Sequence, residues 1–140
     1  MLRWMIDTDL CIRVLRDRPA AARQRFNAEA HALCISVVTL TELLYGAEKS
    51  TRQAENRRAV EDFADRVAVL PFDPAAAAHT ADIRATLERR GMAIGGYDTM
   101  IAGHARSRGL VVVTGNLREF SRVDGLRAED WLAAQAADSQ

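Results

Sequence analysis

The chain has 140 residues, of which 49% are hydrophobic and 27% charged, and this composition excludes an intrinsically disordered protein. Equal numbers of acidic and basic residues give a formal net charge of zero, which argues against binding nucleic acid by bulk attraction alone. No apolar run approaches the roughly 20 residues that span a bilayer, and no secretory signal is visible, so we expect a cytoplasmic protein without membrane association. Cys11 and Cys34 lack metal-ligand spacing and are interpreted as reduced core thiols.

Strand-like and helix-like segments alternate along the chain. Short apolar runs predict buried strands, and longer stretches with apolar residues three or four apart predict helices. In chain order we expect a strand over 3–6, helices over 9–16 and 19–29, a strand over 33–37, a helix from 39, a helix to about 67, a strand over 67–72, a helix from 73 to 89 or 90, a helix over 98–109, a strand over 110–113 and a closing segment over 126–131. This alternation predicts one α/β domain over 1–132, with a mainly parallel sheet covered by helices on both faces, and a frayed tail over 133–140.

Turn and cap residues fix several boundaries. Asp73-Pro74 matches an N-cap followed by proline at the first helical position, and Gly91 ends the same helix. Pro71 in the third strand marks that strand as a sheet edge. Thr39 and Glu42 have the spacing of a capping box at a helix start.

Four polar positions fall where strand ends and helix starts should meet. They are Asp7, Glu42, Asp98 and Asn116. In open α/β sheets the ligand crevice lies beyond the carboxyl ends of the strands. Carboxylate and carbonyl oxygens select hard cations such as Mg²⁺ or Mn²⁺, which generate hydroxide and stabilise phosphoryl oxygens. The set therefore indicates a metal-assisted hydrolase.

Each of these positions also has a purely structural interpretation. Asp7 could cap the next helix, Glu42 could complete the capping box, Asp98 would be favoured by a helix dipole, and Asn116 is a common turn residue. The functional hypothesis rests on the set, because three carboxylates at one edge would raise one another's pKa values without a cation.

Other side chains complete the predicted site or are set aside. Thr8 and Thr114 flank the acidic positions, where they either orient carboxylates or contact phosphate, and we predict them as substrate-binding residues. The three histidines, His31, His79 and His104, share no short spacing. We interpret His104 as a packed or surface histidine rather than a ligand.

Four ordered stretches carry a resemblance to a known family. They are MIDT at 5–8, CIS at 34–36 with TELLYGAEKS at 41–50, YDTMIAGHA at 97–105 and VVTGNLREF at 112–120. In these stretches the chain resembles the VapC toxins, which are ribonucleases of the PIN-domain family. The resemblance implies a PIN fold and Mg²⁺- or Mn²⁺-dependent endonucleolytic cleavage of RNA.

The resemblance also assigns roles to the four positions. The family's three acidic residues fall on Asp7, Glu42 and Asp98, which we expect to be catalytic and to hold the metal. The fourth position falls on Asn116, which we also expect to be catalytic. Because an asparagine supplies no charge, Asn116 acts through water or holds the turn.

Partners follow from the same resemblance. It implies a VapB-type antitoxin whose tail lies across the acidic groove and whose other half binds operator DNA, so that DNA contact is indirect. It also implies a homodimer. The family's substrates are structured RNAs, most often tRNA anticodon loops, whose cleavage inhibits translation.

Two rival functions are weighed against this one. Asp7-Thr8-Asp9 could be the paired aspartates of a phosphatase or phospho-receiver domain, but that chemistry requires a lysine after a later strand. Lys49 is the only lysine and follows the second strand in a helix, so this hypothesis fits poorly. The other alternative is a non-catalytic PIN-fold module that binds RNA or protein, against which the retained carboxylates argue.

Overall fold

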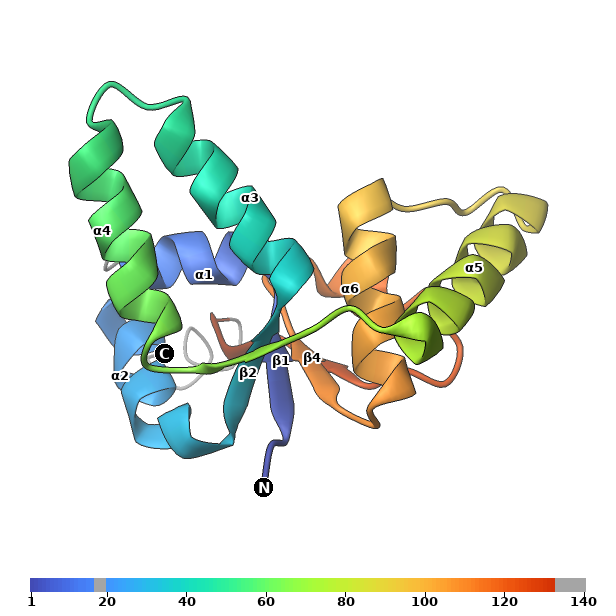
Figure 1. The fold of residues 1–140 in the computed structure, drawn as a ribbon. Helices are drawn as coiled ribbons and strands as arrows, with labels where there is room; N and C mark the ends of the chain where they lie inside the picture. The colour runs from blue at the N-terminus through green and yellow to red at the C-terminus, as the bar shows by residue number, and fades with distance from the viewer. Residues whose placement is uncertain (17–19, 133–140) are drawn as a thin grey trace.

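The computed structural model describes residues 1–16 and 20–132 (Figure 1). The strands in these ranges are β1 (Trp4–Ile6), β2 (Leu33–Ser36), β3 (Ala68–Leu70), β4 (Val111–Val113) and β5 (Ala128–Glu129). The helices there are α1 (Thr8–Leu15), α2 (Ala20–Glu29), α3 (Val37–Glu48), α4 (Gln53–Ala64), α5 (Pro74–Arg89), α6 (Gly96–Ser107) and α7 (Leu117–Phe120), with a 3-10 turn, η1 (Ala30–Ala32). The predicted start of the second helix at 19 and the predicted tail over 133–140 lie outside the described residues.

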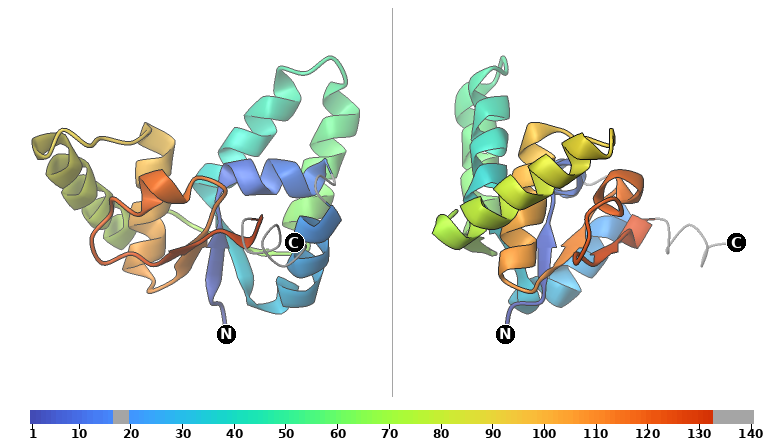
Figure 2. Two further views of the ribbon diagram at one scale, coloured as in Figure 1. Left: turned by 180° about the vertical axis from the view of Figure 1, so that it is seen from behind. Right: turned by 90° about the vertical axis from the view of Figure 1, so that its right-hand side faces the viewer.

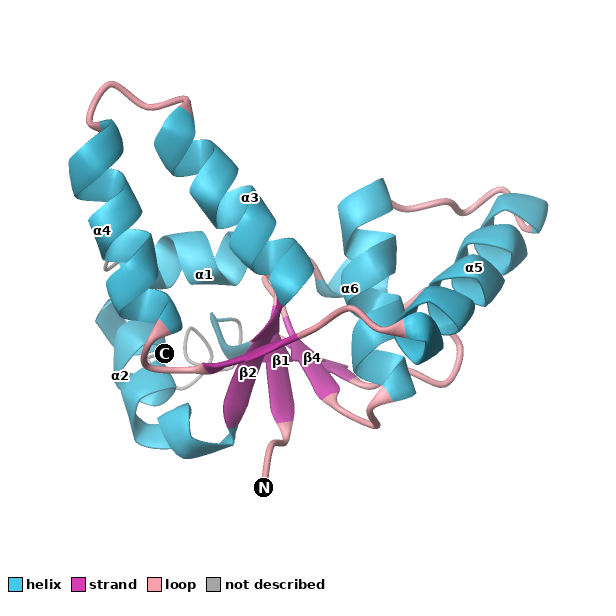
Figure 3. Ribbon diagram, in the orientation of Figure 1, coloured by secondary structure: helices cyan, strands magenta, loops and turns pink. Residues whose placement is uncertain are grey.

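The five strands form one parallel sheet in the order β3-β2-β1-β4-β5. The predicted α/β class with a mainly parallel sheet and helices on both faces is therefore confirmed (Figure 3). β3 is an edge strand, as Pro71 indicated, and it ends one residue before this proline. β5 was not predicted as a strand, because its two residues are too short to carry a pattern.

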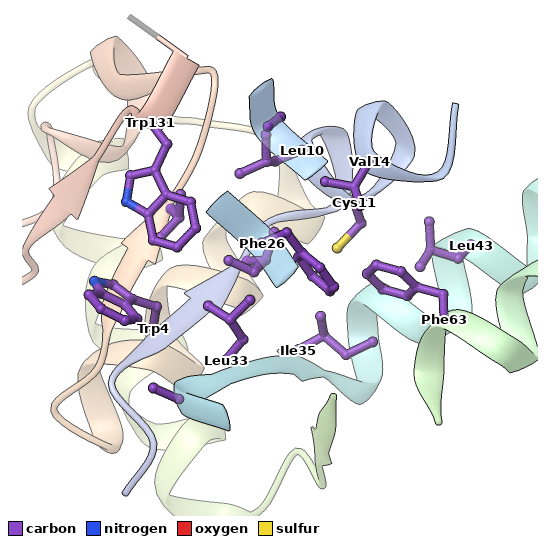
Figure 4. Packing of buried hydrophobic residues seen from close by; sticks show 14 of the residues in the cluster. Trp4, Leu10, Cys11, Val14, Phe26, Leu33, Ile35, Leu43, Phe63 and Trp131 are labelled. Carbon is purple, nitrogen blue, oxygen red and sulfur yellow. The ribbon is translucent and has the colours of Figure 1, made fainter. Parts of the chain in front are cut away.

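Alternate residues of the central strand β1 enter two separate hydrophobic clusters. Trp4 and Ile6 pack with residues of α1, α2 and α4 on one face of the sheet, and Met5 packs with residues of α5 and α6 on the other. In the first cluster the rings of Phe26 and Phe63 stack with centroids 5.2 Å apart (Figure 4). The period-two alternation of β1 thus builds a core on each face.

Both cysteines are buried, as predicted. Cys11 and Cys34 carry free thiols in the two opposite clusters. Burial raises the pKa of Cys34 to about 12, and it raises the pKa of Cys11 well above the usual value. Neither thiol is available as a nucleophile near neutral pH.

Two helical hairpins flank the sheet, one packed on each face. α3 and α4 form one, and α5 and α6 form the other (Figures 1 and 2). The second hairpin is packed closely, because a β-carbon at Gly103 of α6 would lie 2.6 Å from the Thr80 nitrogen of α5. The position of α6 therefore depends on a residue without a side chain. Among the described helices, none is long and apolar enough to cross a membrane.

Two helix starts differ from the prediction, and one carries a correction. α3 begins at Val37 rather than Thr39, because the Ser36 hydroxyl at the end of β2 accepts a hydrogen bond from the Val38 nitrogen and caps the helix. The predicted Thr39–Glu42 capping box is therefore wrong. α6 begins at Gly96, so that Asp98 lies in its first turn rather than at its start. By contrast, Asp73 caps α5 and Gly91 ends it with a φ of 65°, as predicted.

Candidate active site

The predicted acidic positions lie where three neighbouring strands end. Asp7 follows β1, the start of α3 follows β2, and Thr114 follows β4. Because β2, β1 and β4 are adjacent and parallel, their carboxyl ends share one edge of the sheet. Hydrogen bonds that span 34 and 107 residues of sequence join side chains across this edge.

Asp7 is held on both carboxylate oxygens. Its Oδ1 accepts a hydrogen bond of 2.9 Å from the Leu10 nitrogen, which makes it the N-cap of α1. Its Oδ2 accepts a hydrogen bond of 2.5 Å from the hydroxyl of the buried Thr114. Asp7 is only 2% exposed, and this burial raises its pKa to about 6 against the lowering effect of both hydrogen bonds. The capping interpretation of Asp7 is thus correct, and the same carboxylate still faces the charges of Asp9 and Asp98.

Glu42 is oriented by a threonine rather than by its own helix. The Thr8 hydroxyl donates a hydrogen bond of 2.6 Å to Glu42 Oε1, and Thr8 Oγ1 lies 3.2 Å from Thr39 Oγ1. Because an ionised carboxylate has no proton, the single proton of Thr8 goes to Glu42, and Thr39 donates to Thr8. Thr39 is therefore not a helix cap. It is fully buried, and it acts on Glu42 indirectly, through its hydrogen bond to Thr8.

Asp98 completes the carboxylate group from the first turn of α6. It is half-buried, and its pKa is raised to about 6, first by burial and then by the charges of Glu119, Asp9 and Glu42. Four carboxylates besides Asp7 thus lie near enough to interact at this edge. The structure brings the predicted Asp7, Glu42 and Asp98 into one electrostatic environment.

Glu119 was not predicted as a site residue. It lies in the short helix α7 directly after β4, and its charge has the largest electrostatic effect on the pKa of Asp98. The rule that selected Asn116, a polar residue at a helix start beyond a strand end, would also have found Glu119 three residues later.

Asn116 has a position that agrees with its turn interpretation. It precedes α7, its backbone nitrogen donates a hydrogen bond of 2.8 Å to Thr114 Oγ1, and its side chain does not cap the helix. Through Thr114, the backbone of Asn116 is linked to Asp7.

His104 is a packed histidine, as predicted. It is 1% exposed, and its Nδ1 lies 2.8 Å from the Ser36 hydroxyl, which also caps α3. Burial lowers the pKa of His104, so the ring is neutral near pH 7. The pair joins α6, which carries Asp98, to the start of α3, which carries Glu42.

The donor chemistry suits a hard divalent cation. Carboxylate oxygens from Asp7, Glu42 and Asp98 are ligands that such ions prefer, and each Asp7 oxygen keeps a lone pair beyond its hydrogen bond. In the parts of the chain that the structure describes, no three acidic, histidine or cysteine side chains are grouped closely enough to hold one ion together. The residues therefore fit an ion that takes one or two carboxylates and keeps several waters, as Mg²⁺ does.

A groove opens beside these carboxylates. It has a volume of about 1050 Å³ and is lined by residues of α1, α3, α4 and the first turn of α6. Its lining includes Asp9, Glu42, Tyr45, Lys49 and Tyr97. We call it the acidic groove.

Comparisons with known proteins agree with this fold. A family model described as the PIN domain matches residues 4–126. The chain is 55% identical over 131 residues to the tRNA(fMet)-specific endonuclease VapC of Shigella flexneri, covering 94% of this chain and 99% of that protein. It is 46% identical over 132 residues to ribonuclease VapC2 of Haemophilus influenzae strain Rd, covering 94% of this chain and 100% of that protein.

Solved structures give the same grouping. The fold is similar to that in the crystal structure of DNA-bound VapBC from Salmonella typhimurium, with a TM-score of 0.90, 54% identity and coverage of 94% of this chain and 99% of that one. It is also similar to VapBC-1 from nontypeable Haemophilus influenzae, with a TM-score of 0.84, 32% identity and coverage of 94% and 99%.

Proposed function

The chain belongs to the PIN-domain family, and we propose that it is the toxin of a VapBC-type toxin–antitoxin pair, an endoribonuclease that inhibits translation by cutting structured RNA. One observation carries the proposal: in a chain 55% identical to a tRNA(fMet)-specific endonuclease, Asp98 shares its electrostatic environment with Glu42 and Glu119 at the strand ends. The proposed substrate is a tRNA, with tRNA(fMet) as the first to test and the anticodon loop as the proposed place of cleavage.

The side chains have proposed roles in hydrolysis of the phosphodiester. Asp7 and Asp98 would hold Mg²⁺ or Mn²⁺ directly, and Glu42 would bind it through water or orient the attacking water. When bound, such an ion activates a water molecule and stabilises charge on the phosphoryl oxygens. Asn116 acts through water or holds the turn between β4 and α7.

The two threonines preorganise this site. Thr114 fixes one oxygen of Asp7, and Thr8 fixes one oxygen of Glu42, so neither carboxylate has to be ordered when substrate arrives. Both hydroxyls are buried, and both remain proposed contacts of the substrate phosphate, since Thr8 lines the groove and Thr114 donates to Asp7. Their hydrogen bonds support the orienting role most directly.

The proposed partners act at the same groove. A VapB-type antitoxin would lay its tail across the acidic groove and exclude RNA, and its other half would bind operator DNA, so that this chain contacts DNA only indirectly. We further propose that residues 1–132 form one PIN domain, that two copies form a homodimer, and that the pair acts in the cytoplasm, where tRNA is available.

The test is cleavage of total tRNA by the purified, antitoxin-free protein with Mg²⁺ or Mn²⁺. Discrete fragments are expected, and they should disappear with EDTA and in Asp7→Asn, whose side chain keeps the size of aspartate. Asp62→Asn, the same substitution at an exposed position on α4, is the matched control and should cleave normally. A folded wild-type protein that cuts no RNA with either metal would favour the non-catalytic PIN-fold module instead.

A further inference from the structure

Two exposed tyrosine rings in the acidic groove have no role in the chemistry proposed above. Tyr45 on α3 is 58% exposed and Tyr97 on α6 is 56% exposed, and both line the groove. They are the only two tyrosines of the chain. Tyrosine is enriched at binding interfaces, and two exposed rings in one groove are consistent with a binding surface.

Each tyrosine is close in sequence to a carboxylate of the site. Tyr45 follows Glu42 by three residues, which places both on the same face of α3, and Tyr97 directly precedes Asp98. α3 and α6 contact each other beyond the end of β1 (Figure 1). The groove is lined mainly by α1, α3 and α4, and Tyr97 borders it from the first turn of α6. Both rings therefore share the groove with Glu42.

Stacking is the interaction that these rings can offer to a nucleic acid. Unpaired bases stack on tyrosine faces, and each stacked base contributes roughly 1–3 kcal/mol by alanine substitution. Paired bases in a duplex present no free face. Stacking does not require a basic surface, which suits a chain whose formal net charge is zero.

Lys49 adds a cation at one of the two rings. Its Nζ lies 5.1 Å from the centroid of the Tyr45 ring and lines the same groove. The ammonium orients the ring and occupies one face, which leaves the other face for a base. The same ammonium is a potential contact for a phosphate of the bound strand.

We propose that Tyr45 and Tyr97 form a stacking platform that holds unpaired bases of an RNA loop on either side of the scissile phosphate. This inference rests on the proposed ribonuclease function and deepens it, because it accounts for a preference for single-stranded loops. The rings select the loop, and the carboxylates of the adjoining site, of which Glu42 lines the same groove, act on its backbone.

The first test labels the platform itself. Incorporation of 3-fluorotyrosine gives two ¹⁹F resonances, one for each ring, which Tyr45→Phe and Tyr97→Phe assign. With EDTA present to prevent cleavage, a hairpin RNA with an unpaired loop should shift both resonances. The same stem as a blunt duplex should leave them in place. If the duplex shifts them as strongly as the hairpin, the rings do not read unpaired bases and the proposal falls.

The second test separates stacking from simple bulk. Leucine at either position should lower kcat/KM for hairpin cleavage roughly 5- to 150-fold, mainly through KM, whereas phenylalanine should stay within about twofold of wild type. Met92→Leu, at a residue that is 43% exposed and does not line the groove, is the matched control. Thermal melts check that each variant is folded.

The possible outcomes distinguish the stacking platform from the ribonuclease function on which it rests. If the wild type cleaves RNA, the tyrosine variants cleave it equally well and the ¹⁹F resonances do not shift, the stacking platform is overturned and the nuclease function stands. Normal RNA cleavage by variants that escape inhibition by a VapB-type antitoxin also overturns it, and assigns the rings to the protein partner. Shifted resonances without cleavage by the wild type would keep the platform and reject the nuclease.

Discussion

Alanine at Gly103 should destabilise the protein although alanine is the better helix former. The new β-carbon would lie 2.6 Å from the nitrogen and 2.7 Å from the Cα of Thr80. Favourable carbon–carbon contacts need roughly 3.5–4.0 Å, so α5 and α6 would have to separate by about 1 Å. Backbone atoms cannot rotate away as a side-chain end can.

The magnitude follows from two opposing effects. Overpacking of a tight core contact costs about 1–3 kcal/mol, and the upper part of this range applies because the neighbour is backbone. The helix propensity of alanine over glycine returns about 1 kcal/mol. A net loss of about 2 kcal/mol should lower the Tm by roughly 6 °C for a chain of this length.

Gly46→Ala is the matched control for this substitution. Gly46 is also inside a helix, α3, but a β-carbon there would meet nothing within 4 Å. This variant should gain up to about 1 kcal/mol and a Tm increase of roughly 2–3 °C. Urea unfolding and thermal melts of both metal-free variants measure the difference. If Gly103→Ala is as stabilising as Gly46→Ala, the close approach of α5 and α6 is refuted.

Three further predictions concern the site and its support. In metal-free protein the pKa of Asp98 is about 6 when folded and 3.8 in the unfolded reference, so ionisation costs stability as pH rises from 4 to 6. Asp98→Asn should remove this loss and increase the free energy of unfolding by about 1 kcal/mol at pH 7, after allowance for solvent screening at a half-buried group. Urea unfolding of the wild type and the variant at pH 4 and pH 7 measures this gain. A strong destabilisation by Asp98→Asn would instead identify a structural role for Asp98. Thr114→Val should lower the rate of tRNA cleavage at least tenfold, because it removes the hydroxyl that donates to Asp7. Thr114→Ser keeps this donor and should retain most of the wild-type rate. Equal rates for the two variants would exclude the orienting role of Thr114. Ser36→Ala and His104→Leu should each lower the free energy of unfolding by about 1–3 kcal/mol, as measured by urea unfolding. Their double-mutant cycle should give a coupling energy of at least about 0.5 kcal/mol. Strictly additive effects would rule out the buried hydrogen bond between the two side chains.

Local patterns in the sequence were sufficient for the layout of the fold. The apolar run before Asp7, the Asp73-Pro74 cap and the Gly91 stop each depend on residues a few positions away, and each was found where it was predicted. The same local rules placed Asp7 and Asn116 at the ends of strands, because a parallel sheet puts polar residues beyond its carboxyl ends. The roles of these residues in catalysis stay predictions.

The tertiary structure decided how the side chains of the site are held. The Thr39–Glu42 spacing favoured a capping box, but the hydroxyl that reaches Glu42 belongs to Thr8, 34 residues earlier in the chain. The proximity of Glu119 to Asp98 and the pairing of His104 with Ser36 likewise depend on the order in which the strands lie side by side. Hydrophobic periodicity specifies which face of an element is buried, but it carries no information about which element becomes its neighbour, so partners across the sheet edge are fixed only when the strands assemble.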